Sequence, residues 1–206
     1  YVDTLITAEA QIPDVVRLMV GHVVYEKPKT HSMVSKDAPI VLEAEHLLSR
    51  DVKDVSFTLR QGEILGFSGL VGAGRTETMQ LICGAAPLDS GVIRVRGKAV
   101  KIRSPRDAVR HGIGYLSEDR KRYGLCLGLS VTDNTVLPSL DRLCKGLFVH
   151  DRALDRQAQL CVERINIKTS STKIRVRNLS GGNQQKVVIS KWLLRDCDIL
   201  IFDEPT

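Results

Sequence analysis

The order of apolar and polar residues along the chain predicts strands that alternate with helices. Stretches typical of β-strands occur at 40–47, 55–59, 63–70, 112–116 and 198–202. Apolar residues with the spacing of an α-helix occur in three places: after Gly74, at 153–165 and after Gly182. Buried strands that alternate with helices predict an α/β fold with a mostly parallel core sheet and ligands at the strand ends.

A separate strand pattern lies at 92–103, where basic residues alternate with apolar ones. Alternation of this kind is typical of half-buried strands with one solvated face. The pattern predicts an antiparallel flank beside the core sheet, with a turn at Gly97 and Lys98.

The first 39 residues differ in character from the rest. Residues 10–20 have the spacing of a short amphipathic helix, which ends at Gly21. Residues 22–39 are polar, contain two prolines and lack a period, so we expect a linker there. The main domain is therefore expected to span 40–206.

Composition is that of an ordinary globular domain, with 206 residues, 43% of them hydrophobic and 26% charged. The longest uncharged stretch, at 64–74, is far shorter than the ~20 apolar residues that span a bilayer. A membrane role would therefore need a separate membrane partner. Asp3 and Glu9 stand where a secretory signal would be basic and then apolar.

The five cysteines are scattered and form no C-x-x-C pair, which favours reduced thiols in the cytosol.

The formal net charge of +6 raises the question of nucleic-acid binding. The basic residues are dispersed, however, and no aromatic residues lie among those at 94–103 and 173–177 to stack on bases. This distribution favours solvated faces over a nucleic-acid surface.

Residues 69–77, GLVGAGRTE, follow most of the phosphate-loop pattern G-x-x-x-x-G-K-[ST]. The backbone of such a loop cradles phosphates, and the candidate binding residues are Gly69, Leu70, Val71, Gly72, Ala73, Gly74, Arg75, Thr76 and Glu77. Arg75 replaces the lysine, and its longer planar fork does not reproduce an ammonium group. Thr76 offers the hydroxyl that usually binds Mg²⁺. Taken alone, the loop leaves nucleotide binding and a plain strand-to-helix turn equally open.

Two further motifs come later in the chain. In LSGGNQQK (179–186), Ser180, Gly181 and Gly182 begin a helix, either as an exposed anion site or as a simple N-cap by the serine. The stretch ILIFDE (199–204) reads as a buried strand that delivers two acids to its carboxyl end. There Asp203 could hold Mg²⁺ through water and Glu204 could polarise an attacking water, although a core strand that runs into an acidic loop is common.

These motifs, in this order, resemble the nucleotide-binding domain of ABC transporter ATPases. With GIGYLSEDRKRYGL (112–125), they resemble more specifically the second of two fused domains in ATP-binding proteins of bacterial monosaccharide importers, of the ribose, galactose and xylose type. The resemblance covers 40–206, and residues 1–21 resemble the tail of the preceding domain.

The resemblance implies a P-loop NTPase fold of ABC type, with a helical subdomain beside the mostly parallel core sheet and its antiparallel flank. A domain of this type handles ATP and Mg²⁺. Two such domains pair head to tail, so Ser180, Gly181, Gly182 and Gln184 would cap a nucleotide held by the first domain. Glu118 falls at the position of the glutamine that contacts Mg²⁺ and water. The implied partners are transmembrane permease subunits and, indirectly, a periplasmic sugar-binding protein, with no nucleic acid. The implied location is the cytoplasmic face of the bacterial inner membrane.

Several departures shape the expected function. Arg75 and Glu77 weaken the loop, and the sequence stops before the switch histidine and the aspartate loop of the family. We therefore expect an incomplete domain with a degenerate loop of its own, slow or absent turnover as an isolated chain, and an intact signature motif that serves the partner site. Two alternatives stay open: an ATPase of the same fold that acts on nucleic acid or ribosomes, with salt-sensitive binding, and a regulatory module that binds nucleotide without hydrolysis.

Overall fold

The computed structural model describes residues 3–7, 11, 14–15, 18, 34–144 and 150–204. The chain divides into two units, Tyr1–Lys36 and Asp37–Thr206. In the first, the backbone N–H groups of Asp14 and Val15 donate to the carbonyl oxygen of Gln11 and begin a helical turn. Most of the helix expected at 10–20 and of the linker expected at 22–39 lies outside the described residues.

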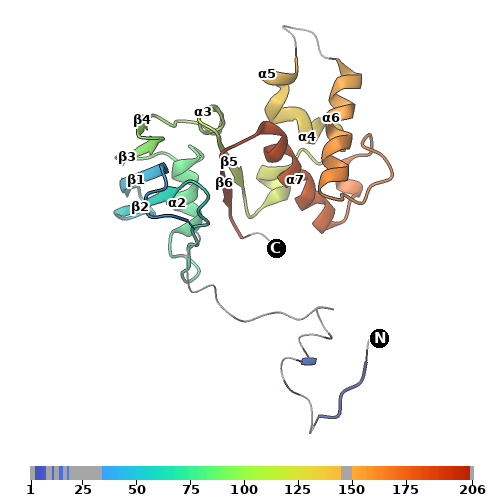
Figure 1. Ribbon diagram of the computed structural model, residues 1–206, viewed down its shortest axis with the longest axis horizontal. Coiled ribbons are helices and arrows are strands. Elements are labelled where there is room, and N and C mark those ends of the chain that lie inside the picture. Colours follow the sequence, from blue (N-terminus) through green and yellow to red (C-terminus); the bar gives the residue numbers. More distant parts are fainter. Residues whose placement is uncertain are drawn as a thin grey trace. The chain divides into compact units, whose positions relative to one another are not determined.

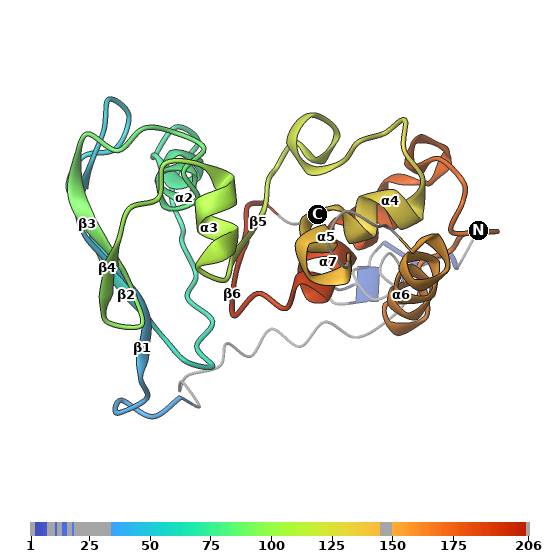
Figure 2. The same cartoon turned by 90° about the horizontal axis from the view of Figure 1, so that it is seen from above.

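A twisted antiparallel sheet forms one layer of the second unit (Figures 1 and 2). Its strands, in the order β2-β1-β3-β4, are β1 (Ile40–Leu48), β2 (Val55–Arg60), β3 (Ser90–Val95) and β4 (Lys98–Val100). The strands expected at 40–47 and 55–59 and the antiparallel flank are thus confirmed. The hairpin turn lies one residue earlier than expected, because Val95 pairs with Lys98. Arg96 and Gly97 form the turn with φ values of 49° and 74°, the left-handed backbone that a two-residue hairpin loop needs.

The parallel part of the described fold consists of β5 (Ile113–Leu116) and β6 (Ile199–Phe202), which confirms both expected strands. Helices and single turns complete the unit: α2 (Arg75–Ile82), α3 (Pro105–Arg110), η1 (Arg120–Gly124), α4 (Val131–Val136), η2 (Leu137–Ser139), α5 (Leu140–Leu143), α6 (Asp151–Arg164), η3 (Val176–Asn178) and α7 (Gly181–Arg195). Figure 2 shows the parallel pair between the antiparallel sheet with α2 and α3 on one side and helices α4 to α7 on the other.

Two hydrophobic cores meet at the parallel pair. Ile113 at the start of β5 belongs to a core built from the antiparallel sheet and α2, whereas Leu116 at its end belongs to a core that includes Val131 of α4 and Val187 of α7. Strand β5 therefore fixes the sheet layer and the helical part to one another, and its carboxyl end lies at their junction.

The strand expected at 63–70 is absent, which corrects the sequence-based prediction. Residues 63–70 belong to no ladder, and Ile64 is 98% exposed. Phe67 packs edge-on against Phe57, with ring centroids 4.9 Å apart. A ladder requires a neighbouring strand about 4.8 Å away. Beside this segment lies instead a cleft of about 980 Å³ that separates it from β6.

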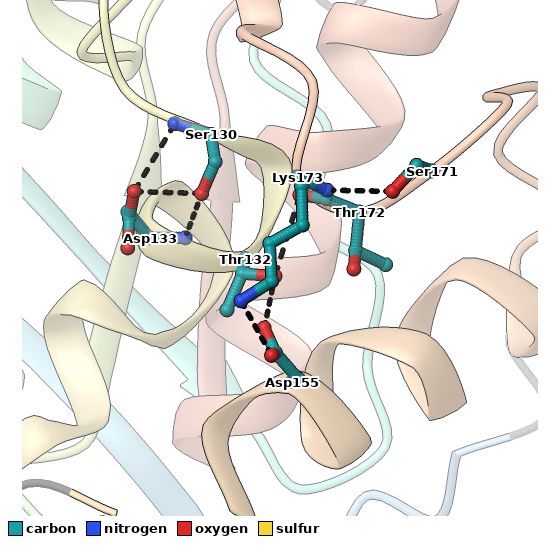
Figure 3. A network of polar contacts seen from close by, with 7 residues as sticks. All are labelled: Ser130, Thr132, Asp133, Asp155, Ser171, Thr172 and Lys173. Atoms are coloured by element: carbon teal, nitrogen blue, oxygen red, sulfur yellow. Dashed lines mark hydrogen bonds and ion pairs between the residues drawn. The ribbon is translucent and has the colours of Figure 1, made fainter. Parts of the chain in front are cut away.

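A polar network holds the helical part together (Figure 3). Thr132 of α4 donates through Oγ1 to Asp155 of α6 at 3.0 Å, and Lys173 pairs with the same carboxylate. The backbone N–H of Thr132 donates to the carbonyl of Thr172 at 3.0 Å. The contact with Lys173 holds the pKa of Asp155 below its ordinary value. The loop that leads into η3 and α7 is thus bound to both α4 and α6.

All five cysteines lie in the described part, and none forms a disulfide. Burial raises the pKa of the Cys83 thiol to about 12, so this side chain behaves as a small apolar residue. Among the described helices, none is both long enough and apolar enough to cross a bilayer.

Helix α6 offers a matched test of the packing. Leu154→Ala should lower the free energy of unfolding by about 2–5 kcal/mol, because Leu154 is 6% exposed and its loss leaves a cavity. Leu160→Ala removes the same atoms from the same helix at a side chain that is 51% exposed, and should change stability by about 0.5 kcal/mol or less. Urea unfolding measures both, and equal effects would contradict the packing of α6.

Candidate functional site

The glycine loop has the backbone of an anion-binding turn. Gly72 and Gly74 both have a φ of 81°, a conformation that favours glycine, and Gly74 immediately precedes α2. No side chain caps the first turn of α2, and Glu77 lies in that turn. Residues 69–73 are exposed. The backbone N–H groups at this helix start are therefore available to an anion such as a phosphate.

The carboxylate of Asp203 lies next to this helix start. Its Oδ1 accepts a hydrogen bond from Thr76 Oγ1 at 3.0 Å, and its Oδ2 accepts one from the Tyr115 hydroxyl at 2.8 Å. Asp203 is only 8% exposed, and its backbone N–H donates to the carbonyl of Leu116 at 2.9 Å. The structure thus brings together two of the three side chains that the sequence analysis predicts as Mg²⁺ ligands, and a hydroxyl with a carboxylate suits Mg²⁺.

Arg75 is directed to the acidic end of β6. Its Nη2 lies 3.1 Å from Oε1 of Glu204, and both side chains are partly exposed. Glu204 has a φ of 46°, which turns the chain sharply after Asp203. The residue that replaces the phosphate-loop lysine is therefore paired with the residue predicted to polarise water.

Glu118 reaches the same place from the end of β5. A cavity of about 20 Å³, large enough for one water molecule, is lined by Leu116, Ser117, Glu118, Arg120, Gln185, Val188, Asp203 and Glu204. We call Glu118, Asp203 and Glu204 the acidic edge. Within the described residues, no group of three or more His, Cys, Asp or Glu side chains is arranged to hold a metal ion. Mg²⁺ bound here would need phosphate oxygens and waters to complete its six ligands.

The predicted signature residues begin α7. Ser180 occupies the N-cap position, but its side chain does not cap the helix; its Oγ accepts a hydrogen bond from Asn183 Nδ2 at 2.9 Å. Gly181 and Gly182 form the first turn, which leaves its N–H groups available. Gln184 differs from the other three because it is buried and its Nε2 donates to the carbonyls of Val176 and Leu179. In this geometry Gln184 shapes the turn, and Gln185 faces the small cavity instead.

Sequence reasoning missed two residues near the site. Tyr115 is the middle of an apolar strand, and only the fold shows its hydroxyl against Asp203. Arg120 belongs to a charged stretch that reads as surface, yet it lines the small cavity. Burial and the hydrogen bond to Asp203 raise the pKa of Tyr115, so its phenol stays protonated and donates.

A cleft of the second unit adjoins Arg75 but not the glycine turn that precedes it. The cleft of about 980 Å³ between residues 60–67 and β6 is lined by Arg75, Asp203 and Glu204, among others, but by none of residues 68–74. A phosphate site on this chain is therefore an open turn at the surface, not an enclosed pocket.

Comparison with known sequences identifies the family. The sequence model of the ABC transporter family matches residues 52–206, a range that contains the loop, β5, α7 and β6. The chain belongs to the ABC transporter family. Over 208 residues it is 52% identical to putative ribose/galactose/methyl galactoside import ATP-binding protein 1 of Burkholderia lata. It is 46% identical to ribose import ATP-binding protein RbsA of Lactococcus lactis subsp. lactis.

These alignments cover 100% of this ABC transporter chain but only 40% and 41% of the two relatives. The chain thus spans about two fifths of the length of the curated relatives it matches. Among solved structures, it is similar to a dimeric ATP-binding cassette in a post-hydrolysis state with ADP and phosphate, with a TM-score of 0.66, 19% identity, and coverage of 80% and 74% of the two chains. This similarity confirms the predicted α/β fold of ABC type.

The hydrogen bond between Tyr115 and Asp203 should stabilise the fold, so a variant without the Tyr115 hydroxyl should be less stable. Tyr115→Phe should lower the free energy of unfolding by about 1.5–3 kcal/mol, because a buried carboxylate oxygen loses its donor. Since the pKa of this phenol is higher in the folded chain, the unfolded chain loses the proton first, and this contribution falls as pH rises above about 10. Urea unfolding at pH 8 and pH 10.5 measures both effects.

Tyr123→Phe is the control, because that tyrosine is 65% exposed and should change stability by about 0.5 kcal/mol or less. Equal losses in the two variants at pH 8 would exclude a stabilising contact between Tyr115 and Asp203.

Proposed function

We propose that this chain is part of the ATP-binding subunit of a bacterial ABC importer for a monosaccharide. The support is its family together with identities near 50% to ribose and galactose import proteins over its whole length. We further propose that residues 40–206 form the second of two nucleotide-binding domains, that 1–21 end the first, and that 22–39 join them. Its partners would be the first domain, permease subunits and, through them, a sugar-binding protein at the inner membrane.

The observation that carries the finer proposal is the ion pair between Arg75 and Glu204. A guanidinium that is paired with this carboxylate takes up acceptor positions that an attacking water would need. The charge of Arg75 is also shared with Glu204, whereas the lysine of a phosphate loop would offer its charge to phosphates. We infer that this loop binds ATP but turns it over slowly.

The residues fit the nucleotide and its metal. The N–H groups at the start of α2 and the turn of residues 69–74 would hold phosphates, while Thr76 and Asp203, with Glu118, would hold Mg²⁺. Bound Mg²⁺ would neutralise phosphate charge beside these acids. Ser180, Gly181 and Gly182 would meet the nucleotide of the first domain, which we propose as the site of faster turnover.

A nucleic-acid-directed ATPase of the same fold finds less support. Several basic side chains are already paired with acids: Arg94 with Glu43 and Glu45, Arg96 with Asp198, and Lys173 with Asp155. These pairs reduce the free positive charge that a phosphate backbone would meet.

The test compares two proposed roles of this chain: its own loop, with slow turnover, and its residues 180–182, which serve the site of the first domain. It uses the complete ATP-binding subunit, reconstituted with its permease. Gly182→Ala should lower ATP hydrolysis by about tenfold or more, because the added methyl group stands where a nucleotide would approach the backbone. This substitution fits the fold, since a Cβ at Gly182 has no atom within 4 Å and the backbone needs no left-handed φ. Arg75→Ala should change hydrolysis by about threefold or less.

The reverse order, with a large loss in Arg75→Ala and little in Gly182→Ala, would assign turnover to this chain's own loop and contradict the division of roles. A complete subunit that never hydrolyses ATP would support the regulatory alternative.

A further inference from the structure

Arg120 lies between the two parts of the site. It begins η1, directly after the loop that carries Glu118, and it lines the cavity shared by the acidic edge. On its other side it approaches the first turn of α7: a Cβ placed on Gly181 would lie 2.7 Å from Arg120 Nη2. One side chain therefore adjoins both the acidic edge and residues 180–182, which we call the signature turn.

The position of this guanidinium is electrostatically unusual. The N-terminus of α7 carries a partial positive charge, so a cation beside it is disfavoured unless negative groups are near. The Nε of Arg120 is buried and has no hydrogen-bond partner. A buried donor of a charged group without an acceptor costs free energy, and native proteins keep few of them. The acids that line the cavity offset the positive charge of Arg120. Its Nε–H, however, has no acceptor and can donate a further hydrogen bond.

The segment that carries Arg120 is attached firmly to α7. Residues 120–124 form a single π-helical turn, which is a rare geometry. Asp119 caps this turn by accepting hydrogen bonds from the backbone N–H groups of Lys121 and Arg122, at 3.1 Å each. At its end, the carbonyl of Gly124 accepts a hydrogen bond from Lys191 of α7. A shift of α7 is therefore passed to η1 and to the end of β5.

We propose that Arg120 is a positioning residue that couples the signature turn to the acidic edge, so that nucleotide bound at one changes the other. This coupling rests on the proposed function, because it needs a nucleotide at each place. The guanidinium suits the role because its fork of donors can serve two groups at once, which a lysine ammonium on a flexible stem does less well.

The experiment measures steady-state ATP hydrolysis by the complete subunit with its permease. Arg120→Ala should lower kcat by about tenfold while KM for Mg-ATP changes by about threefold or less, since positioning and not nucleotide affinity is lost. Arg120→Lys should restore part of kcat. The control is Arg122→Ala in the same turn, because Arg122 stacks on Tyr123 at 5.1 Å, and it should stay within about twofold of wild type.

A double-mutant cycle with Glu118→Gln tests the coupling itself. Each loss is the factor by which kcat falls below that of the wild type. If Arg120 acts through the acidic edge, the factor for the double variant should be about fivefold smaller than the product of the factors for the two single variants. Losses that multiply, or an Arg120→Ala variant as active as Arg122→Ala, would overturn the coupling. Thermal unfolding is measured for every variant, and if Arg120→Ala does not fold, Arg120→Lys and Arg120→Gln take its place in the cycle.

The failure of this inference is distinct from the failure of the proposed function. An inactive wild-type subunit overturns the proposed function, whereas an active wild type with an unaffected Arg120→Ala variant overturns the coupling alone.

Discussion

The carboxylate of Asp203 accepts one hydrogen bond from Thr76 at the start of α2 and another from Tyr115 in β5, at 3.0 and 2.8 Å. Its backbone N–H also extends the pairing of β6 with Leu116. Segments that lie 127 and 88 residues before Asp203 in the sequence thus meet at this one side chain, which is almost fully buried. Because an unpaired buried carboxylate would be costly, these contacts restrict how the glycine loop, β5 and β6 can be arranged.

The rest of the site follows from this arrangement. With Asp203 fixed, Glu204 turns outward at a positive φ and meets Arg75, and Glu118 comes to the same cavity from the end of β5. The two cores keep the sheet layer and the helical part together through β5. Chemistry at the acidic edge and the position of α7 are therefore linked by the fold, and Arg120 is the side chain that adjoins both.

Much of this fold could be predicted from local pattern alone. Strands β1, β5 and β6 and helix α6 follow from apolar spacing, because burial of one face or of both faces imposes the period. The strand expected at 63–70 did not form, since an apolar run does not encode the neighbour that a ladder requires. The hairpin turn differed by one residue, because Arg96 adopts a left-handed backbone that its residue type does not suggest.

The site was predictable to a similar degree. The motifs predict Thr76, Asp203 and Glu204 as candidates because each lies at a fixed offset from a helix start or a strand end. The contacts of Tyr115 and Arg120 depend on segments that are distant in sequence, so no local pattern reveals them. The burial of Gln184 depends on the carbonyls of Val176 and Leu179, which the structure brings under the first turn of α7.

The central claim is that the loop with Arg75 still binds a nucleotide but hydrolyses it slowly. Calorimetric titration of the folded chain with Mg-ATP, with phosphate release followed in the same sample, tests it most directly. The account predicts saturable binding at one site per chain, with phosphate release close to that of buffer alone. A chain that is folded by circular dichroism and gives no binding heat at millimolar Mg-ATP would contradict it.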